Sequence, residues 1–162
     1  MKARFISLSA LFTALYAVGV IVLAPISFGV IQCRVADALI ALSTVFGWPV
    51  IIGVTLGCIA ANLYGGLGLV DVVGGSLANF LAAWLGYIIA KRFVTTRKTL
   101  FIATLTQSAT IGLVVGGYLR ILFNLPAPLT IATVLAGSLI SICGLGNLLI
   151  SILKKAARAV YL

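Results

Sequence analysis

Long apolar runs, separated by short interruptions that contain proline, glycine or charge, dominate the chain and predict membrane-spanning helices. A spanning helix needs about 20 mainly apolar residues. We expect six spans, at about 5–24, 33–46, 50–64, 69–90, 99–123 and 129–153. The second and third runs are short and meet at a turn signal, Gly47-Trp48-Pro49. They form either two tilted spans or one re-entrant excursion.

The composition places the chain in the membrane class. It has 162 residues, of which 63% are hydrophobic and 8% charged, whereas a soluble domain needs a far more charged surface. We therefore expect a single all-α membrane domain over residues 1–162, in a multi-pass protein of the cell membrane. The first run has the basic start of a signal peptide but is longer than a signal core, and Pro25 follows its best cleavage candidate, so we expect it to be retained.

The basic residues fix the expected topology. The net charge of +9 comes from groups at the two ends of the chain and in one interruption, not from a patch suited to nucleic acid, so we expect no nucleic-acid partner. The groups are Lys2 with Arg4, Lys91 and Arg92 with Arg97 and Lys98, and Lys154 and Lys155 with Arg158. Positive residues favour the cytoplasmic side. Six spans, with both termini cytoplasmic and the loops at 24–33, 65–69 and 124–128 outside, satisfy all three groups.

The four charges outside those groups are Arg34, Asp37, Asp71 and Arg120, and the topology puts all of them near the extracytoplasmic ends of their helices. A charge in the apolar zone costs about 2.5 to 3.5 kcal/mol on insertion scales, so it usually faces a partner or a water-filled cavity. Two interpretations remain open. The residues form structural ion pairs, Arg34 with Asp37 and Asp71 with Arg120, or they line a small-molecule pocket open to the outside.

Neutral groups near Asp71 extend the candidate pocket. Asn62 offers an amide, and Tyr64, beside the glycine-rich turn, offers an aromatic surface. The chain has no histidine, no phosphate-binding GxxxxGK[ST] loop and three isolated cysteines without metal-ligand spacing. We therefore expect a protein that is not an enzyme, with no cofactor and no metal.

Two stretches carry a family resemblance. APISFGVIQCRVADAL, residues 24–39, and GCIAANLYGGLGLVDVVGGSLANFLAA, residues 57–83, resemble the QueT-type queuosine-precursor transporter family. Its members are substrate-binding S components of energy-coupling factor transporters. The resemblance implies a six-helix protein that captures a 7-deazaguanine, such as preQ1 or preQ0, from outside. It also implies delivery through a transmembrane coupling subunit energised by two ATPase subunits.

The resemblance assigns roles to particular residues. It implies that Gln32, Arg34, Asp37, Asn62 and Asp71 line the pocket, to which the sequence adds Tyr64 and Arg120 as candidates. It implies further that Ala10 and Ala14, within SALFTALYA, form the face that docks on the coupling subunit within membrane lipid. We interpret residues 25–33 as a lid with Gly29 as its flexible point. The alternatives are an S component for another vitamin or base, and a structural membrane protein without transport function.

Overall fold

The computed structural model describes residues 2–28, 33–94 and 96–160, and all regular structure in these ranges is helical. In chain order the elements are α1 (Lys2–Val22), α2 (Ala24–Ser27), the 3₁₀ helix η1 (Val35–Leu42), α3 (Ser43–Phe46), α4 (Trp48–Gly65), α5 (Leu69–Arg92), α6 (Arg97–Phe123), α7 (Ala127–Ser138), the π-helix η2 (Leu139–Gly146) and α8 (Asn147–Val160). Five helical stretches of the described chain are long and apolar enough to cross a membrane. They are α1, α4, α5, α6 and the continuous stretch Ala127–Ala156.

The short run that we counted as the second of six spans forms a short helix inside the bundle. It comprises η1 and α3, Val35–Phe46, and falls below the length of the five candidate spans. Most of η1 is buried, and it packs against α1, α4, α5, α6 and η2. A helix covered by other helices need not match the thickness of the lipid core, because protein rather than lipid surrounds it. Six spans are thus not confirmed: the described chain has five long apolar helices and one short, largely buried helix.

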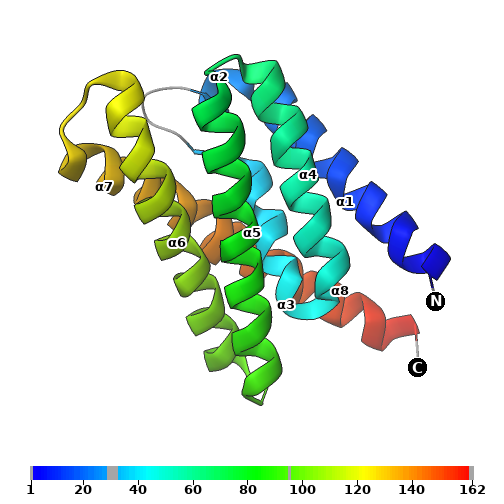
Figure 1. The fold of residues 1–162 in the computed structure, drawn as a ribbon. Helices are drawn as coiled ribbons and strands as arrows, with labels where there is room; N and C mark the ends of the chain where they lie inside the picture. The colour runs from blue at the N-terminus through cyan, green and yellow to red at the C-terminus, as the bar shows by residue number, and fades with distance from the viewer. Residues whose placement is uncertain (1, 29–32, 95, 161–162) are drawn as a thin grey trace.

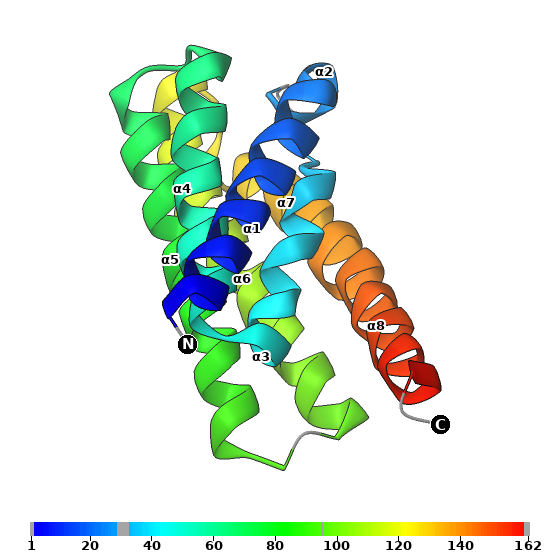
Figure 2. The ribbon, with the colours of Figure 1, turned by 90° about the vertical axis from the view of Figure 1, so that its right-hand side faces the viewer.

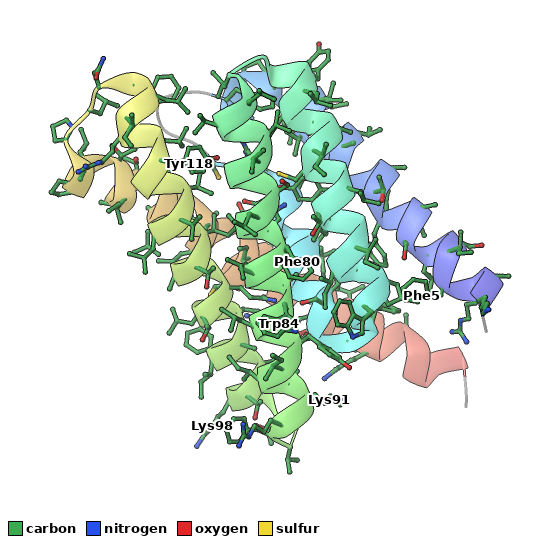
Figure 3. All side chains as sticks on the ribbon, viewed as in Figure 1. Phe5, Phe80, Trp84, Lys91, Lys98 and Tyr118 are labelled. Atoms are coloured by element: carbon green, nitrogen blue, oxygen red, sulfur yellow. The ribbon has the colours of Figure 1, made fainter. Side chains whose placement is uncertain are left out.

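The helix ends separate into two groups at opposite ends of the bundle. The two termini and the turn between α5 and α6 lie toward the lower end of Figure 1, whereas α2 and the α4–α5 turn lie at the upper end. The view from the side shows the same separation, with η1 and α3 between α1 and the α7–α8 stretch (Figure 2). Lys91 and Lys98 mark the lower end and Tyr118 lies toward the upper end (Figure 3). The basic groups therefore share one end, as their pattern predicts.

Glycine geometry shapes the turn that leads into α5. Gly66 and Gly68 have φ values of 70° and 96°, in the left-handed region that glycine tolerates best. α5 begins directly after Gly68, which places Asp71 in its first turn. A carboxylate there is stabilised by the positive end of the helix dipole. The short polar stretch thus both turns the chain and presents a buried acid at the upper end.

Small residues bring neighbouring helices into close contact. A Cβ added at Gly53 of α4 would lie 2.5 Å from Cβ of Phe12 in α1. One added at Gly116 of α6 would lie 2.7 Å from Cα of Ile131 in α7. Both distances are too short for a real side chain, so these glycines allow the backbones to approach. Such packing supplies much of the helix association in lipid, where the hydrophobic drive is small.

Six neutral polar residues in or beside the interior tie α6 to the short helix, to α7 and to α8; we refer to them as the neutral cluster. They are Ser43, Thr104, Gln107, Ser108, Ser138 and Asn147. Gln107 Nε2 donates to the Ile40 carbonyl at 3.2 Å and to Ser43 Oγ at 3.0 Å. Asn147 Nδ2 donates to Thr104 Oγ1 at 2.9 Å. These hydrogen bonds connect helices that are distant in sequence and hold η1 and α3 in place.

Candidate functional site

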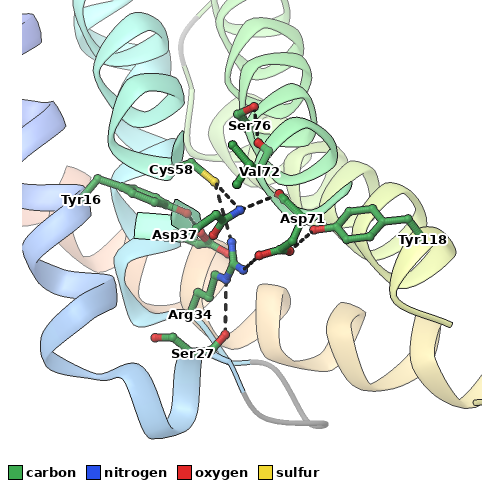
Figure 4. A network of polar contacts seen from close by, with 10 residues as sticks. Tyr16, Ser27, Arg34, Asp37, Cys58, Asp71, Val72, Ser76 and Tyr118 are labelled. Carbon is green, nitrogen blue, oxygen red and sulfur yellow. Dashed lines mark hydrogen bonds and ion pairs between the residues drawn. The ribbon is translucent and has the colours of Figure 1, made fainter. Parts of the chain in front are cut away.

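Residues from the two stretches that carry the family resemblance, 24–39 and 57–83, meet inside the bundle (Figure 4). Arg34 and Asp37 come from the start of η1, Asn62 from the last turn of α4, and Asp71 from the first turn of α5. We refer to these four residues as the charged cluster. All are buried: the exposed fraction is 6% for Arg34, 4% for Asp37 and zero for the other two. Burying so many charged and polar groups is costly unless they find partners.

Arg34 stands at the centre of the cluster. Its Nη2 lies 3.7 Å from Asp71 Oδ2, which makes an ion pair, and its Nε donates to the Ser27 carbonyl at 3.4 Å. The guanidinium carbon lies 5.3 Å from the centre of the Phe28 ring, within the range of a cation–π contact. Arg34 therefore links the end of α1–α2 to α5.

A tyrosine holds each carboxylate. The Tyr16 hydroxyl of α1 donates to Asp37 Oδ1 at 2.5 Å, and the Tyr118 hydroxyl of α6 donates to Asp71 Oδ1 at 2.7 Å. Each bond occupies one oxygen and fixes the orientation of the acid. Tyr16 is a residue of the site that the sequence did not predict. The one available signal was a hydroxyl-bearing aromatic in the middle of an apolar span.

Three buried atoms of the charged cluster have no hydrogen-bond partner among the described residues: Arg34 Nη2, Asn62 Oδ1 and Asp71 Oδ2. The ion pair between Arg34 and Asp71 is too long to count as a hydrogen bond. Asn62 uses its amide nitrogen, which donates to the Asp71 carbonyl at 2.7 Å, and so leaves its oxygen available. Unsatisfied buried groups cost about 1 to 3 kcal/mol each. One donor and two acceptors at one place indicate a site prepared for a polar ligand.

The open space at the cluster is small. A cavity of about 10 Å³ is lined by Arg34, Asp37, Asn79, Ile111, Val115 and Val134. That volume suits about one water molecule, whereas pockets for drug-sized ligands measure roughly 300 to 1,000 Å³. A planar heterocycle would have to displace side chains on entering. Phe28 is half-buried over Arg34 and packs closely against Gly65 of α4, so it is one of the side chains that border the cluster.

The model of one protein family matches nearly the whole chain. That model describes the QueT transporter and covers residues 6–155. The chain belongs to the QueT transporter family. No curated protein and no solved structure matches the chain. Membership confirms the resemblance read from residues 24–39 and 57–83, and with the five long apolar helices it makes the chain a multi-pass membrane protein of a transporter family.

Several predicted residues of this QueT-family chain lie elsewhere than expected. The proposed pairing of Arg34 with Asp37 and of Asp71 with Arg120 is wrong, because Arg34 pairs with Asp71 and the Arg120 side chain is exposed. Tyr64 is 65% exposed at the end of α4 and does not reach the cluster. Arg120 and Tyr64 lie on exposed faces of α6 and α4, respectively. Gln32 and Gly29 lie outside the described residues, so the role of the first and the lid hypothesis stay predictions.

Ala10 and Ala14 line a groove on the outer face of α1 and α4. The groove measures about 530 Å³ and is formed by residues from Phe5 to Ala17 on α1 and by Ile52 and Leu56 on α4. Almost all of the lining is apolar, and the small alanine side chains leave the groove open. The predicted docking pair therefore lies on an accessible surface, separate from the charged cluster inside the bundle.

Proposed function

We propose that this chain is the substrate-binding S component of an energy-coupling factor importer. It captures a queuosine precursor, a 7-deazaguanine such as preQ1 or preQ0, from outside the cell. A coupling subunit and two ATPase subunits then drive its uptake. The proposal is supported by the QueT family match and by the charged cluster, and it extends the general transporter role to a particular cargo and assembly.

The observation that carries the cargo assignment is the set of atoms without hydrogen-bond partners. A 7-deazaguanine presents along one edge a carbonyl oxygen, an N1–H and an amino group, which is one acceptor followed by donors. Arg34 Nη2 is the matching donor, and Asp71 Oδ2 and Asn62 Oδ1 are matching acceptors. Ligands that lack one of these groups would leave a buried partner unpaired, which rejects them more strongly than shape alone.

The helix dipole and Tyr118 prepare Asp71 for this role. The start of α5 favours a negative charge at Asp71, and the Tyr118 hydroxyl holds Oδ1, so that Oδ2 is the oxygen available to the ligand. Because the orientation is set before the ligand arrives, less entropy is lost on binding. We therefore assign Asp71 the main role in recognising the ligand by hydrogen bonds, and Arg34 the role of the ion-pair partner of Asp71.

The groove on α1 and α4 supports the assignment of a membrane partner. Its alanines allow close approach of another helix, and its apolar lining suits a partner inside the membrane. The sequence contains no phosphate-binding loop of the Walker type, so ATP hydrolysis of that kind has to come from partner subunits. In this proposal the groove docks on the coupling subunit and the charged cluster holds the cargo.

The experiment that tests the cargo is the identification of whatever the protein carries and binds. The chain is purified in mild detergent, any small molecule released on denaturation is identified by mass, and preQ1 and preQ0 are titrated by calorimetry. We expect a bound or bindable 7-deazaguanine. A different heterocycle would replace this cargo with that of another S component, and a protein that binds no small molecule would favour a structural role.

Partner docking is tested by filling the groove. Leucine at Ala10 and Ala14 should abolish co-purification with the coupling subunit and leave precursor binding intact, because the groove and the cluster are separate. Ala132→Leu is the matched control, since Ala132 is exposed on α7 and lies outside the groove. Normal assembly of the double variant would contradict the docking assignment.

A further inference from the structure

The charged cluster carries more negative than positive charge. It contains two carboxylates, Asp37 and Asp71, and one guanidinium, Arg34, all almost fully buried. Residues 29–32 of the adjoining stretch are Gly, Val, Ile and Gln and add no charge, and Arg120 is exposed. The count therefore leaves one negative charge that no side chain of the site balances. A buried charge without a counter-charge is expensive, so a bound ligand that supplies a positive group is favoured.

Asp37 is the carboxylate without an ionic partner. Within residues 2–28, 33–94 and 96–160, the ion pair of the site joins Arg34 to Asp71. Asp37 accepts a hydrogen bond from Tyr16 on Oδ1. That bond orients the acid without neutralising it, because the phenol is a neutral donor. Asp37 thus keeps its second oxygen for another group.

The small cavity lies against this carboxylate. Asp37 and Asn79 supply polar groups to its wall, and Ile111, Val115 and Val134 supply the apolar part. Asn79 donates its amide N–H to the Val54 carbonyl at 3.4 Å, which leaves the amide oxygen as the group it can offer to a donor. A cavity of about 10 Å³ is the size of one water molecule, and a primary ammonium head is of similar size. Arg34 also lines the cavity, and its single charge lies near both carboxylates, with Asp71 Oδ2 in the ion pair at 3.7 Å.

We propose that Asp37 is the counter-ion for a primary ammonium group of the cargo and that the site thereby selects a cationic precursor over a neutral one. This inference rests on the proposed function and refines it. Among 7-deazaguanines, preQ1 carries a protonated aminomethyl group at position 7, and preQ0 carries an uncharged nitrile there. The two ligands share the ring edge that Asp71 reads, so they differ at the group that Asp37 meets.

The test compares the two ligands on two proteins. Calorimetric titration of the wild-type protein should give at least about tenfold tighter binding of preQ1 than of preQ0, as expected for a buried charge pair. Asp37→Asn keeps the shape of the side chain and removes the charge. This substitution should raise the Kd for preQ1 by about tenfold or more and change the Kd for preQ0 by less than about threefold, which would remove the preference for preQ1.

The outcomes separate this inference from the proposed function. Equal wild-type binding of the two ligands, or tighter binding of preQ0, would overturn the cation selectivity and leave the cargo assignment standing. A preference for preQ1 that survives in Asp37→Asn would overturn the role of Asp37. Failure of the wild-type protein to bind either ligand would overturn the proposed cargo, and the selectivity with it. The wild-type comparison stands even if the variant does not fold.

Discussion

The interior contains two polar clusters, and they differ in what they leave unpaired. The neutral cluster joins Gln107 and its neighbours by mutual hydrogen bonds and leaves one atom, Gln107 Oε1, without a partner in the described chain. The charged cluster leaves three such atoms, on Arg34, Asn62 and Asp71, and its Arg34 and Asp37 line a small cavity. Polar groups that are hydrogen-bonded to one another hold helices together, whereas buried polar groups without partners are available to a ligand. We therefore assign a structural role to the neutral cluster and a binding role to the charged cluster.

The largest expected effect comes from removing the charge of Asp71. Asp71→Asn keeps the size of the side chain but loses an ionised acceptor facing the ligand, so the Kd for preQ1 should rise by about 100-fold or more. Calorimetry on the purified variant measures it, with size-exclusion behaviour as the check on folding. A folded variant with the affinity of the wild type would remove Asp71 from the site and erase the distinction between the clusters.

A substitution in the neutral cluster should affect stability rather than binding. Gln107→Leu deletes the donors to the Ile40 carbonyl and Ser43 Oγ, which should lower stability by about 1 to 3 kcal/mol. A thermal unfolding scan in detergent should show a lower midpoint, while the Kd for preQ1 should change less than about threefold. A large loss of affinity in a folded Gln107→Leu protein would mean that this cluster also belongs to the binding site.

Variants of Tyr16 and Tyr118 test whether the orientation of the two carboxylates contributes to ligand affinity. Tyr118→Phe and Tyr16→Phe each remove one hydroxyl donor, to Asp71 and Asp37 respectively. A hydrogen bond to a charged group is worth about 1.5 to 3 kcal/mol, so each variant should bind preQ1 roughly tenfold more weakly. The two variants also distinguish the role of Asp37 from that of Asp71. Only Tyr118→Phe should lower the affinity for preQ0 by a similar factor, since preQ0 has no ammonium group for Asp37. An equal loss of preQ0 affinity in both would contradict that division.

The smallest effect is expected at the two predicted site residues whose side chains are exposed. Arg120→Ala and Tyr64→Phe alter exposed side chains, and we expect Kd values within about twofold of the wild type. The same titration measures them. A tenfold loss in either variant would show that the ligand extends beyond the charged cluster, toward the upper surface.

The sequence predicted the helical membrane architecture because apolar runs and basic groups are local features of the chain. It also singled out Arg34, Asp37, Asn62 and Asp71, which the structure brings together in the interior, because charges and amides at such positions in apolar helices are rare. It could not predict which charge meets which. Arg34 pairs with Asp71, and Asp37 meets Tyr16, because η1 packs between α1 and α5, an arrangement that no spacing along the chain encodes.

Two further differences have physical causes. Residues 33–46 were expected to span the membrane, but apolar content alone does not distinguish a helix facing lipid from one buried among other helices. Tyr64 and Arg120 were expected in the pocket because they lie near polar stretches in the sequence. Adjacent helix positions point about 100° apart, so nearness in sequence does not place side chains on one face.

A structure of the protein with preQ1 bound tests the central claim most directly. We expect the ring edge to lie about 2.7 to 3.2 Å from Arg34 Nη2, Asn62 Oδ1 and Asp71 Oδ2, the three atoms of the cluster that lack hydrogen-bond partners in the described chain. We also expect Phe28 to have moved to admit the ring. A ligand found away from the charged cluster, with these three atoms still unpaired, would contradict it.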